Sequence, residues 1–242
     1  MAHRTGRTAR AARRLMRQIA ETDTDMASDF RQEFVRFAIA RKAVTFGQFE
    51  TKAGRLSPYF FNSGAFNDGD SLNRLAQFYS KAIFASGVQF DMLFGPAYKG
   101  IPLVSAVAVA LAQSTRNAPW AFNRKEVKDH GEGGNIIGAP LVGRVLIIDD
   151  AISAGTAVRE SYDIIRASGA APCGVVVALD RMERGTGSFS AVQEVERSYN
   201  VPVVSVATLD DLVSYLKTDP GLVHHLEAVD GYREQYGVKA HA

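Results

Sequence analysis

The sequence predicts an α/β protein built on a doubly wound parallel sheet. From residue 90 onward, short apolar runs rich in β-branched residues alternate with stretches of helical periodicity, and this alternation is typical of βαβ units. The run at residues 145–148 has four consecutive apolar residues, as expected for a strand covered by helices on both faces. Acidic, basic or glycine-rich residues follow several of these runs, where parallel sheets bind ligands.

Composition indicates a soluble globular protein. The chain has 242 residues, of which 46% are hydrophobic and 22% are charged, enough for one domain with at most a small appendage. A net charge of +2 is too small to imply a nucleic-acid partner, and no apolar run approaches the ~20 residues of a membrane span. The single cysteine, Cys173, excludes an internal disulfide and favours the reducing cytoplasm.

Residues 1–26 form a basic extension that differs from the rest of the chain. Six arginines precede the first carboxylate, Glu21. Arginine-rich leaders of this kind can be transit peptides or nucleic-acid-binding arms. We favour a third interpretation, in which Met26 is a natural start and the preceding residues are an added extension. We expect residues 1–26 to be mobile or a loosely docked helix, and residues 27–242 to form the functional domain.

Two elements are expected before the main sheet. Phe30, Phe34 and Phe37 recur at helical spacing, and Ser28 is suited to cap the start of that helix. Residues 44–49 are typical of a short strand or turn, and the segment 51–62 holds Lys52 and an aromatic strand. The adjacent Phe60 and Phe61 must point to opposite faces of such a strand, so at least one of them faces something other than the core.

The next elements alternate regularly. We expect helices over residues 73–86 and 101–113 and strands over residues 90–94 and 120–123. The turn 95–100 lacks the Gly-Lys-Ser/Thr ending of a P-loop. The charged, glycine-rich stretch 124–135 has no apolar periodicity and predicts a mobile loop.

The strongest candidate ligand-binding residues are at positions 149–157, directly after the buried strand 145–148. A helix begins after this stretch, and a helix amino terminus can hold a phosphate through its free N–H groups. Gly155 permits a close approach or a positive φ, and the two acids Asp149 and Asp150 are suited to neutral hydroxyls rather than to phosphate. The pattern indicates a ribose-5-phosphate site, with an ordinary βα turn as the alternative.

The remaining elements complete the alternating pattern. We expect strands over residues 175–179 and 203–206 and helices over residues 191–199 and 209–216. Arg181 follows a strand on the ligand side of the sheet and could hold a carboxylate bidentately; a surface salt bridge with Glu183 is the alternative. His224 and His225 are adjacent in a helical stretch and do not share a helix face, so we do not expect them to bind a metal.

These segments together resemble the type I phosphoribosyltransferases, and among them the orotate phosphoribosyltransferases. Residues 145–157 are similar to the family's motif for phosphoribosyl pyrophosphate (PRPP), and residues 95–100 to its pyrophosphate loop. The stretch 124–135 is nearly identical to the family's catalytic loop, and residues 51–62 resemble its small hood subdomain. The resemblance covers roughly residues 30–238 and places the hood mainly in residues 27–70.

The resemblance implies transfer of the 5-phosphoribosyl group from PRPP to orotate in pyrimidine (UMP) biosynthesis. It implies the catalytic residues Lys128, Asp149 and Asp150. It implies PRPP contacts from Lys52, Tyr98, Lys99, Arg124, Lys125, Lys128, His130, Asp149, Asp150, Ala151, Ile152, Ser153, Ala154, Gly155, Thr156 and Ala157. It implies orotate contacts from Lys52, Phe60, Phe61, Ser153 and Arg181. The family commonly has threonine where Ser153 stands, so the hydroxyl is kept but the methyl group is lost.

The resemblance also bears on cofactor and assembly. It implies Mg²⁺ held mainly by substrate and water, without a dense protein cage, and a homodimer that shares the loop 124–135 between subunits. It further implies a cis peptide bond between Ala97 and Tyr98. Two other functions stay open: a purine-salvage phosphoribosyltransferase, which the Phe60–Phe61 segment argues against, and a non-catalytic PRPP-binding regulator, which the basic loop argues against.

Overall fold

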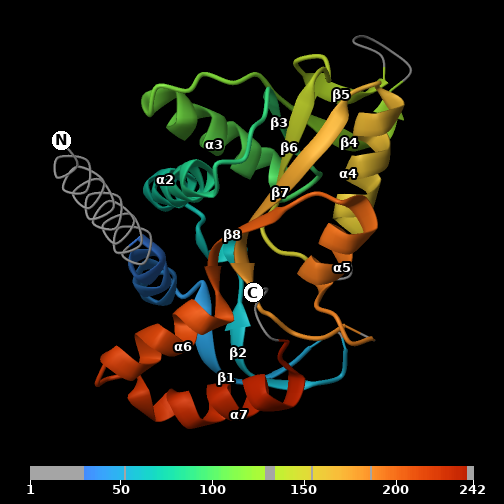
Figure 1. Ribbon diagram of the computed structural model, residues 1–242. Helices are drawn as coiled ribbons and strands as arrows, with labels where there is room; N and C mark the ends of the chain where they lie inside the picture. Colours follow the sequence, from blue (N-terminus) through green and yellow to red (C-terminus); the bar gives the residue numbers. More distant parts are fainter. Residues whose placement is uncertain (1–29, 52, 129–133, 154, 186, 239–242) are drawn as a thin grey trace, which may run out of the picture.

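The fold is organised around a six-stranded sheet with helices on both faces (Figure 1). The computed structural model describes residues 30–51, 53–128, 134–153, 155–185 and 187–238. In spatial order, the strands of the sheet are β5 (Gly134–Gly138), β4 (Trp120–Lys128), β3 (Met92–Gly95), β6 (Arg144–Ile148), β7 (Ala171–Asp180) and β8 (Val203–Thr208). All neighbouring strands are parallel except β5, which runs antiparallel to β4. The predicted doubly wound parallel sheet is confirmed.

The antiparallel edge was not predicted. The stretch expected to be a loop from residue 124 instead continues β4 as far as Lys128, and the chain returns as β5. Residues 129–133, which include His130, lie outside the described residues. The charged stretch therefore forms a two-stranded arm at the edge of the sheet, because the backbone can pair with itself even where the side chains lack apolar periodicity.

The central strand β6 is buried on both faces, as its apolar run predicts. Leu146 and Ile148 belong to one cluster of buried side chains, the first core, and Val145 and Ile147 belong to another, the second core. Each of these four side chains is at most 1% exposed. Helices α2 (Gly69–Ser86) and α3 (Gly100–Gln113) lie on one side of the sheet, and α4 (Thr156–Ala167) and α5 (Ala191–Tyr199) lie on the other (Figure 1). This double cover leaves the strand ends as the positions where polar side chains can meet a ligand.

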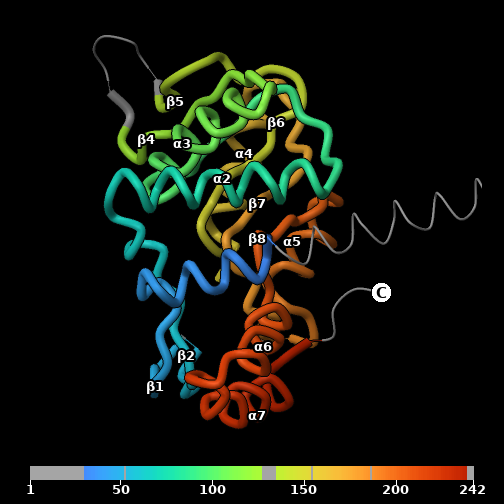
Figure 2. Tube along the Cα trace, turned by 90° about the vertical axis from the view of Figure 1, so that its left-hand side faces the viewer, coloured from blue at the N-terminus to red at the C-terminus, as the bar shows by residue number. Residues whose placement is uncertain are grey.

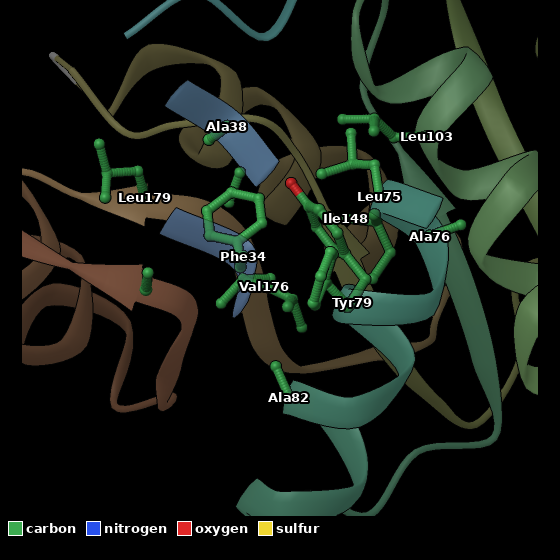
Figure 3. Close-up of a cluster of buried hydrophobic side chains, with 14 of the residues drawn as sticks. Phe34, Ala38, Leu75, Ala76, Tyr79, Ala82, Leu103, Ile148, Val176 and Leu179 are labelled. Carbon is green, nitrogen blue, oxygen red and sulfur yellow. The ribbon is translucent and has the colours of Figure 1, made fainter. Parts of the chain in front are cut away.

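Helix 30–40 closes the first core over α2 and β8. Phe34 is fully buried and lies within the cluster that Figure 3 shows around Leu75 and Tyr79, while Arg31 donates to the carbonyl of Ser205 at 3.1 Å. The proposed cap Ser28 and the extension 1–26 lie outside the described residues. Helix α2 begins four residues before its predicted start, at Gly69, because the Asp68 side chain caps it.

A separate antiparallel hairpin forms the other end of the molecule. Strands β1 (Val44–Glu50) and β2 (Leu56–Phe61) pair with each other and lie beside α6 (Leu209–Thr218) and α7 (Leu226–Tyr236) (Figures 1 and 2). Between those helices, the turn Val223–His225 brings His225 onto the ring of Phe46, with 4.4 Å between the ring centroids. The last elements of the chain therefore support the hairpin.

The turn between β3 and α3 depends on two glycines. A Cβ atom on Gly95 would lie 2.3 Å from the carbonyl oxygen of Gly100, and one on Gly100 would lie 2.6 Å from Cδ of Pro96. Real Cβ atoms do not approach other heavy atoms this closely, so side chains at these positions would displace the turn. Among the described residues, no helix is both long enough and apolar enough to cross a membrane.

We predict that Gly100→Ala lowers the free energy of unfolding by about 1–3 kcal/mol, the usual cost of overpacking a closely packed site. Gly231→Ala is the matched control, because Gly231 lies inside α7 with nothing within 4 Å of the added Cβ. That control should be about 0.5–1 kcal/mol more stable than the wild type, since alanine favours helix. Urea unfolding measures both, and equal effects of the two changes would contradict the close-approach explanation.

Candidate active site

The candidate site lies where the strand order reverses. Strands β3 and β6 are adjacent and parallel, yet the chain passes from β3 to the outer strand β4 and returns to β6. Loops that leave two such strands diverge to opposite faces and open a crevice at their carboxyl ends. The acids after β6 and the turn after β3 meet there: Nζ of Lys99 donates to Oδ2 of Asp150 at 2.7 Å. The structure thus brings together two separately predicted groups.

The acid pair is fixed by two side chains that the sequence analysis did not single out. The Ser63 hydroxyl donates to Oδ2 of Asp150 at 2.6 Å, and the Tyr79 hydroxyl donates to the backbone carbonyl of Asp149 at 2.7 Å. Oδ1 of Asp149 accepts the N–H of Asp150 at 2.9 Å. Nothing local marks Ser63 or Tyr79, because Ser63 follows a distant strand and Tyr79 belongs to the apolar face of α2.

The two acids differ in their electrostatic state. Asp149 is only 6% exposed, and burial, with the neighbouring charge of Asp150, raises the pKa of Asp149 to about 7. Asp150 instead accepts hydrogen bonds from Lys99 and Ser63. Asp149 can therefore bind or release a proton near neutral pH.

The turn after β3 is held from the neighbouring strand. The peptide bond between Ala97 and Tyr98 is cis, as the family resemblance implies. The Ala97 N–H donates to Oδ1 of Asn123 at 2.9 Å, and this asparagine is buried at the end of the part of β4 that lies in the sheet. Asn123 was predicted only as a strand terminus; its role depends on a pairing of strands that local sequence does not show.

The second phosphate-binding candidate is the start of α4. Gly155 precedes the helix with a φ of 69°, as the sequence analysis expected, and no described side chain caps the helix. Ser153 and Thr156 are exposed, whereas Ile152 packs partly against the second core. Ala154 lies outside the described residues. The first N–H groups of α4 are accordingly positioned to bind an anion at the carboxyl end of β6.

The arm carries basic residues toward the β3–α3 turn. Nζ of Lys125 lies 5.6 Å from the ring centroid of Tyr98, which is itself 66% exposed. The backbone of Lys128 ends β4 and pairs with Gly134. The side chain of Lys128 and all of His130 belong to the part of the chain that is not described, so their roles stay predictions.

The predicted base-binding residues divide between the hairpin and the sheet. Phe60 is 45% exposed and stacks on Phe49, whereas Phe61 packs against the first core, so the two rings face opposite ways as expected. Arg181 pairs with Glu183 at 2.6 Å, but both side chains are largely buried, so the pair is an interior one and not the surface salt bridge considered as the alternative. Lys52 lies outside the described residues.

Within the described part of the chain, no group of three His, Cys, Asp or Glu side chains is arranged to hold a metal ion. The oxygen-rich edge formed by Asp149 and Asp150 still offers the hard ligands that Mg²⁺ prefers. Mg²⁺ usually takes one or two carboxylates and completes its shell with water and substrate phosphates. The donor set therefore fits Mg²⁺ brought to the site by a phosphorylated substrate.

Comparison with known proteins agrees with this site. A family described as "Phosphoribosyl transferase domain" matches residues 64–188. The orotate phosphoribosyltransferase of Thiobacillus denitrificans is 64% identical over 211 residues, which are 87% of this chain and 100% of that protein. The chain belongs to the orotate phosphoribosyltransferase family. The relative from Nitrosospira multiformis is also 64% identical, over 86% of this chain and 92% of that protein.

A solved structure supports the same assignment. The crystal structure of orotate phosphoribosyltransferase from Francisella tularensis is 39% identical to this chain and superposes with a TM-score of 0.77. The match covers 85% of this chain and 100% of that one. The sheet, the switch point and the hairpin described above therefore constitute an orotate phosphoribosyltransferase fold of the type I kind.

The raised pKa of Asp149 predicts a pH-dependent stability. The ordinary pKa is 3.8 and the folded value is about 7, so the folded state binds more protons between these values and loses stability as pH rises through them. Asp149→Asn removes this titration while keeping an acceptor for the Asp150 N–H. At pH 8 we expect the variant to be roughly 2–4 kcal/mol more stable than the wild type, since each pKa unit is worth about 1.4 kcal/mol.

Urea unfolding of both proteins at pH 4 and pH 8 provides the measurement. The difference between variant and wild type should grow with pH and level off above about pH 8. A difference that stays constant across this range would show that Asp149 is ionised normally in the folded protein.

Proposed function

We propose that this protein transfers the 5-phosphoribosyl group from PRPP to orotate, giving orotidine 5′-monophosphate and diphosphate in de novo pyrimidine biosynthesis. This is a pentosyl transfer, the chemistry of a glycosyltransferase. The observation that carries the proposal is the meeting of Lys99 and Asp150 at the switch point, because it puts an anion-binding turn beside a hydroxyl-binding acid pair. Membership of the orotate phosphoribosyltransferase family supports orotate as the acceptor.

The proposed PRPP-binding site is formed by the residues that follow β3 and β6. The backbone amides of residues 151–157 would hold the 5′-phosphate at the start of α4, while Asp149 and Asp150 would hold the ribose hydroxyls. Tyr98 and Lys99 on the β3–α3 turn would hold the diphosphate. The additional cationic contacts proposed for PRPP are Lys52, Arg124, Lys125, Lys128 and His130.

In this arrangement Lys99 must exchange partners. In the structure Nζ of Lys99 donates to Asp150 at 2.7 Å; with PRPP bound, the diphosphate would supply the anion for Lys99, and a ribose hydroxyl would donate a hydrogen bond to the Asp150 carboxylate. The exchange replaces one charge-assisted contact by others of similar strength. It therefore keeps the acid satisfied both before and after the substrate binds.

The reaction separates charge at the anomeric carbon. As the bond to diphosphate breaks, positive charge develops on the ribose and negative charge on the leaving group, so the anionic acid pair and the cationic arm stabilise opposite ends of the transition state. Mg²⁺, when bound with PRPP, supplies further neutralisation of the diphosphate. Closure of the arm over the site would exclude water that otherwise hydrolyses PRPP.

Orotate recognition is proposed at the hairpin side of the site. Phe60, the exposed ring of the predicted pair, would contact the pyrimidine ring, while Phe61 packs against the core behind it. Lys52 and Ser153 would contact the polar edge of the pyrimidine, and Arg181 its carboxylate. The position of Arg181 just beyond the carboxyl end of β7 supports this role, since a guanidinium makes strong charge-assisted hydrogen bonds to a carboxylate.

The proposal extends to assembly and location. We infer a homodimer in which the arm 124–135 of one subunit completes the site of the other, supported by the place of β5 and β4 at the edge of the six-stranded sheet. We also infer a cytoplasmic location, supported by the single cysteine.

Loss of orotate absorbance in the presence of PRPP and Mg²⁺ tests the activity. We expect turnover by the wild type and a loss of about 100–1000-fold in kcat for Lys128→Ala, the usual effect of removing one transition-state charge contact. Lys217→Ala is the control, because Lys217 is an exposed lysine in the last turn of α6, and its activity should equal that of the wild type. Full activity of Lys128→Ala would contradict the proposed role of the arm.

Two alternative functions make different predictions in the same assay. A purine-salvage enzyme would consume PRPP with hypoxanthine and not with orotate, and a PRPP-binding regulator would consume neither base. We expect turnover with orotate alone among orotate, hypoxanthine and uracil. A chain without residues 1–25 should keep this turnover, and its loss on that deletion would show that the basic extension belongs to the functional unit.

A further inference from the structure

Arg181 is anchored before any substrate arrives. Its Nε donates to Oε1 of Glu183 at 2.8 Å, and its Nη2 lies 2.6 Å from the same oxygen. Nη2 also donates to the Ser57 hydroxyl on β2 at 3.0 Å. The exposed fractions of the Arg181 and Glu183 side chains are 24% and 16%, respectively, so these contacts are shielded from the competition of water that weakens surface ion pairs.

An aromatic ring covers one face of the same guanidinium. The Arg181 Cζ atom lies 4.3 Å from the ring centroid of Tyr59, which is fully buried. The Tyr59 hydroxyl also reaches Oε1 of Glu183, at 3.4 Å. The ring of Tyr232 from α7 packs edge-on against Tyr59, with 6.4 Å between the ring centroids, and Tyr232 also interacts with Arg181 and Glu183. The guanidinium is therefore held by a carboxylate along one edge and by a ring across one face.

These contacts determine what remains for a ligand. A guanidinium has five N–H donors in a rigid planar fork. Glu183 and Ser57 engage Nε and Nη2, which leaves Nη1 to supply donors to an incoming carboxylate. A free arginine side chain has many rotamers and would lose that freedom on binding. Here the rotamer is already selected, so the cost of ordering is met during folding rather than during binding.

We propose that Glu183 is a positioning residue, which orients Arg181 to bind the carboxylate of the pyrimidine substrate. The inference rests on the proposed function, since it assigns Arg181 to the orotate carboxylate. Glu183 acts through Arg181 and does not itself touch the substrate. Glu183 also balances the charge of Arg181. The site therefore recognises a carboxylate by the direction of the Arg181 N–H donors more than by net positive charge.

The position of Glu183 explains how the two halves of the base pocket keep their alignment. Ser57 and Tyr59 lie on β2, the strand that carries Phe60 and Phe61, whereas Arg181 and Glu183 follow β7 of the main sheet. The shared contacts fix the hairpin against the end of β7. Ring-contacting and carboxylate-binding side chains therefore keep a constant spacing.

Steady-state kinetics of Glu183→Ala and Glu183→Gln in the full chain test this role. We expect Glu183→Ala to raise the KM for orotate by about 10–100-fold, the range for losing a hydrogen bond to a charged group, with the KM for PRPP changed by less than about twofold. Glu183→Gln retains an oxygen acceptor for Nε and should recover most of the loss. Inhibition by uracil, which lacks the carboxylate, should be unchanged in both variants.

A matched control separates positioning from stability. Asp91→Ala removes the carboxylate that pairs with Arg144 at 2.9 Å, at the amino ends of β3 and β6, away from the site. It should lower the melting temperature without changing either KM. In an Arg181→Ala background, Glu183→Ala should add no further increase to the KM for orotate, because the residue that it orients is gone.

The outcomes are distinct. An unchanged or lower KM for orotate in Glu183→Ala, equal increases in both KM values, or additive effects with Arg181→Ala would each overturn the positioning role while leaving the proposed function intact. Absence of orotate turnover by the wild-type chain would overturn the proposed function, and this inference with it.

Discussion

The burial of β6 on both faces is the constraint on which the rest of the structure depends. An apolar strand of this kind must be covered by helices above and below, which forces the chain into alternating crossovers and a parallel sheet. Polar side chains are excluded from the strand itself and can appear only where it ends. The acid pair occupies that end, so one packing requirement determines both the topology and the place of the chemistry.

Burial at the end of β6 also makes it unfavourable to ionise the two carboxylates, and this penalty differs between Asp149 and Asp150. Asp149 is the more deeply buried acid and bears the desolvation, whereas Asp150 is stabilised by Lys99 and Ser63. Two fully ionised carboxylates side by side in this setting would repel strongly. Their different surroundings allow the two acids to lie side by side.

The sequence predicted the features that local pattern controls and failed where contacts span the chain. Apolar runs located the parallel strands, and residues 149–157 located the turn and the start of α4, because each reflects neighbours in sequence. Tyr79, Asn123 and Ser63 were missed because their partners lie far away in the chain. The antiparallel arm was missed because its strands carry charged side chains without apolar periodicity, and the strands pair through backbone hydrogen bonds that this pattern does not reveal. The pair of Arg181 and Glu183 was foreseen, but its burial required knowledge of the hairpin packed over it.

The packing of the hairpin against the last helix has a consequence for how the chain is made. Tyr59 meets Tyr232, and Phe46 meets His225, although each pair joins the first and last thirds of the sequence. Contacts between such distant segments are slow to form because a long loop must close first. On the ribosome, where synthesis proceeds from the amino end, the hairpin emerges early and must wait for the carboxyl-terminal helix before it reaches its final packing. The final packing of the hairpin is thus among the last steps in the folding of a newly made chain.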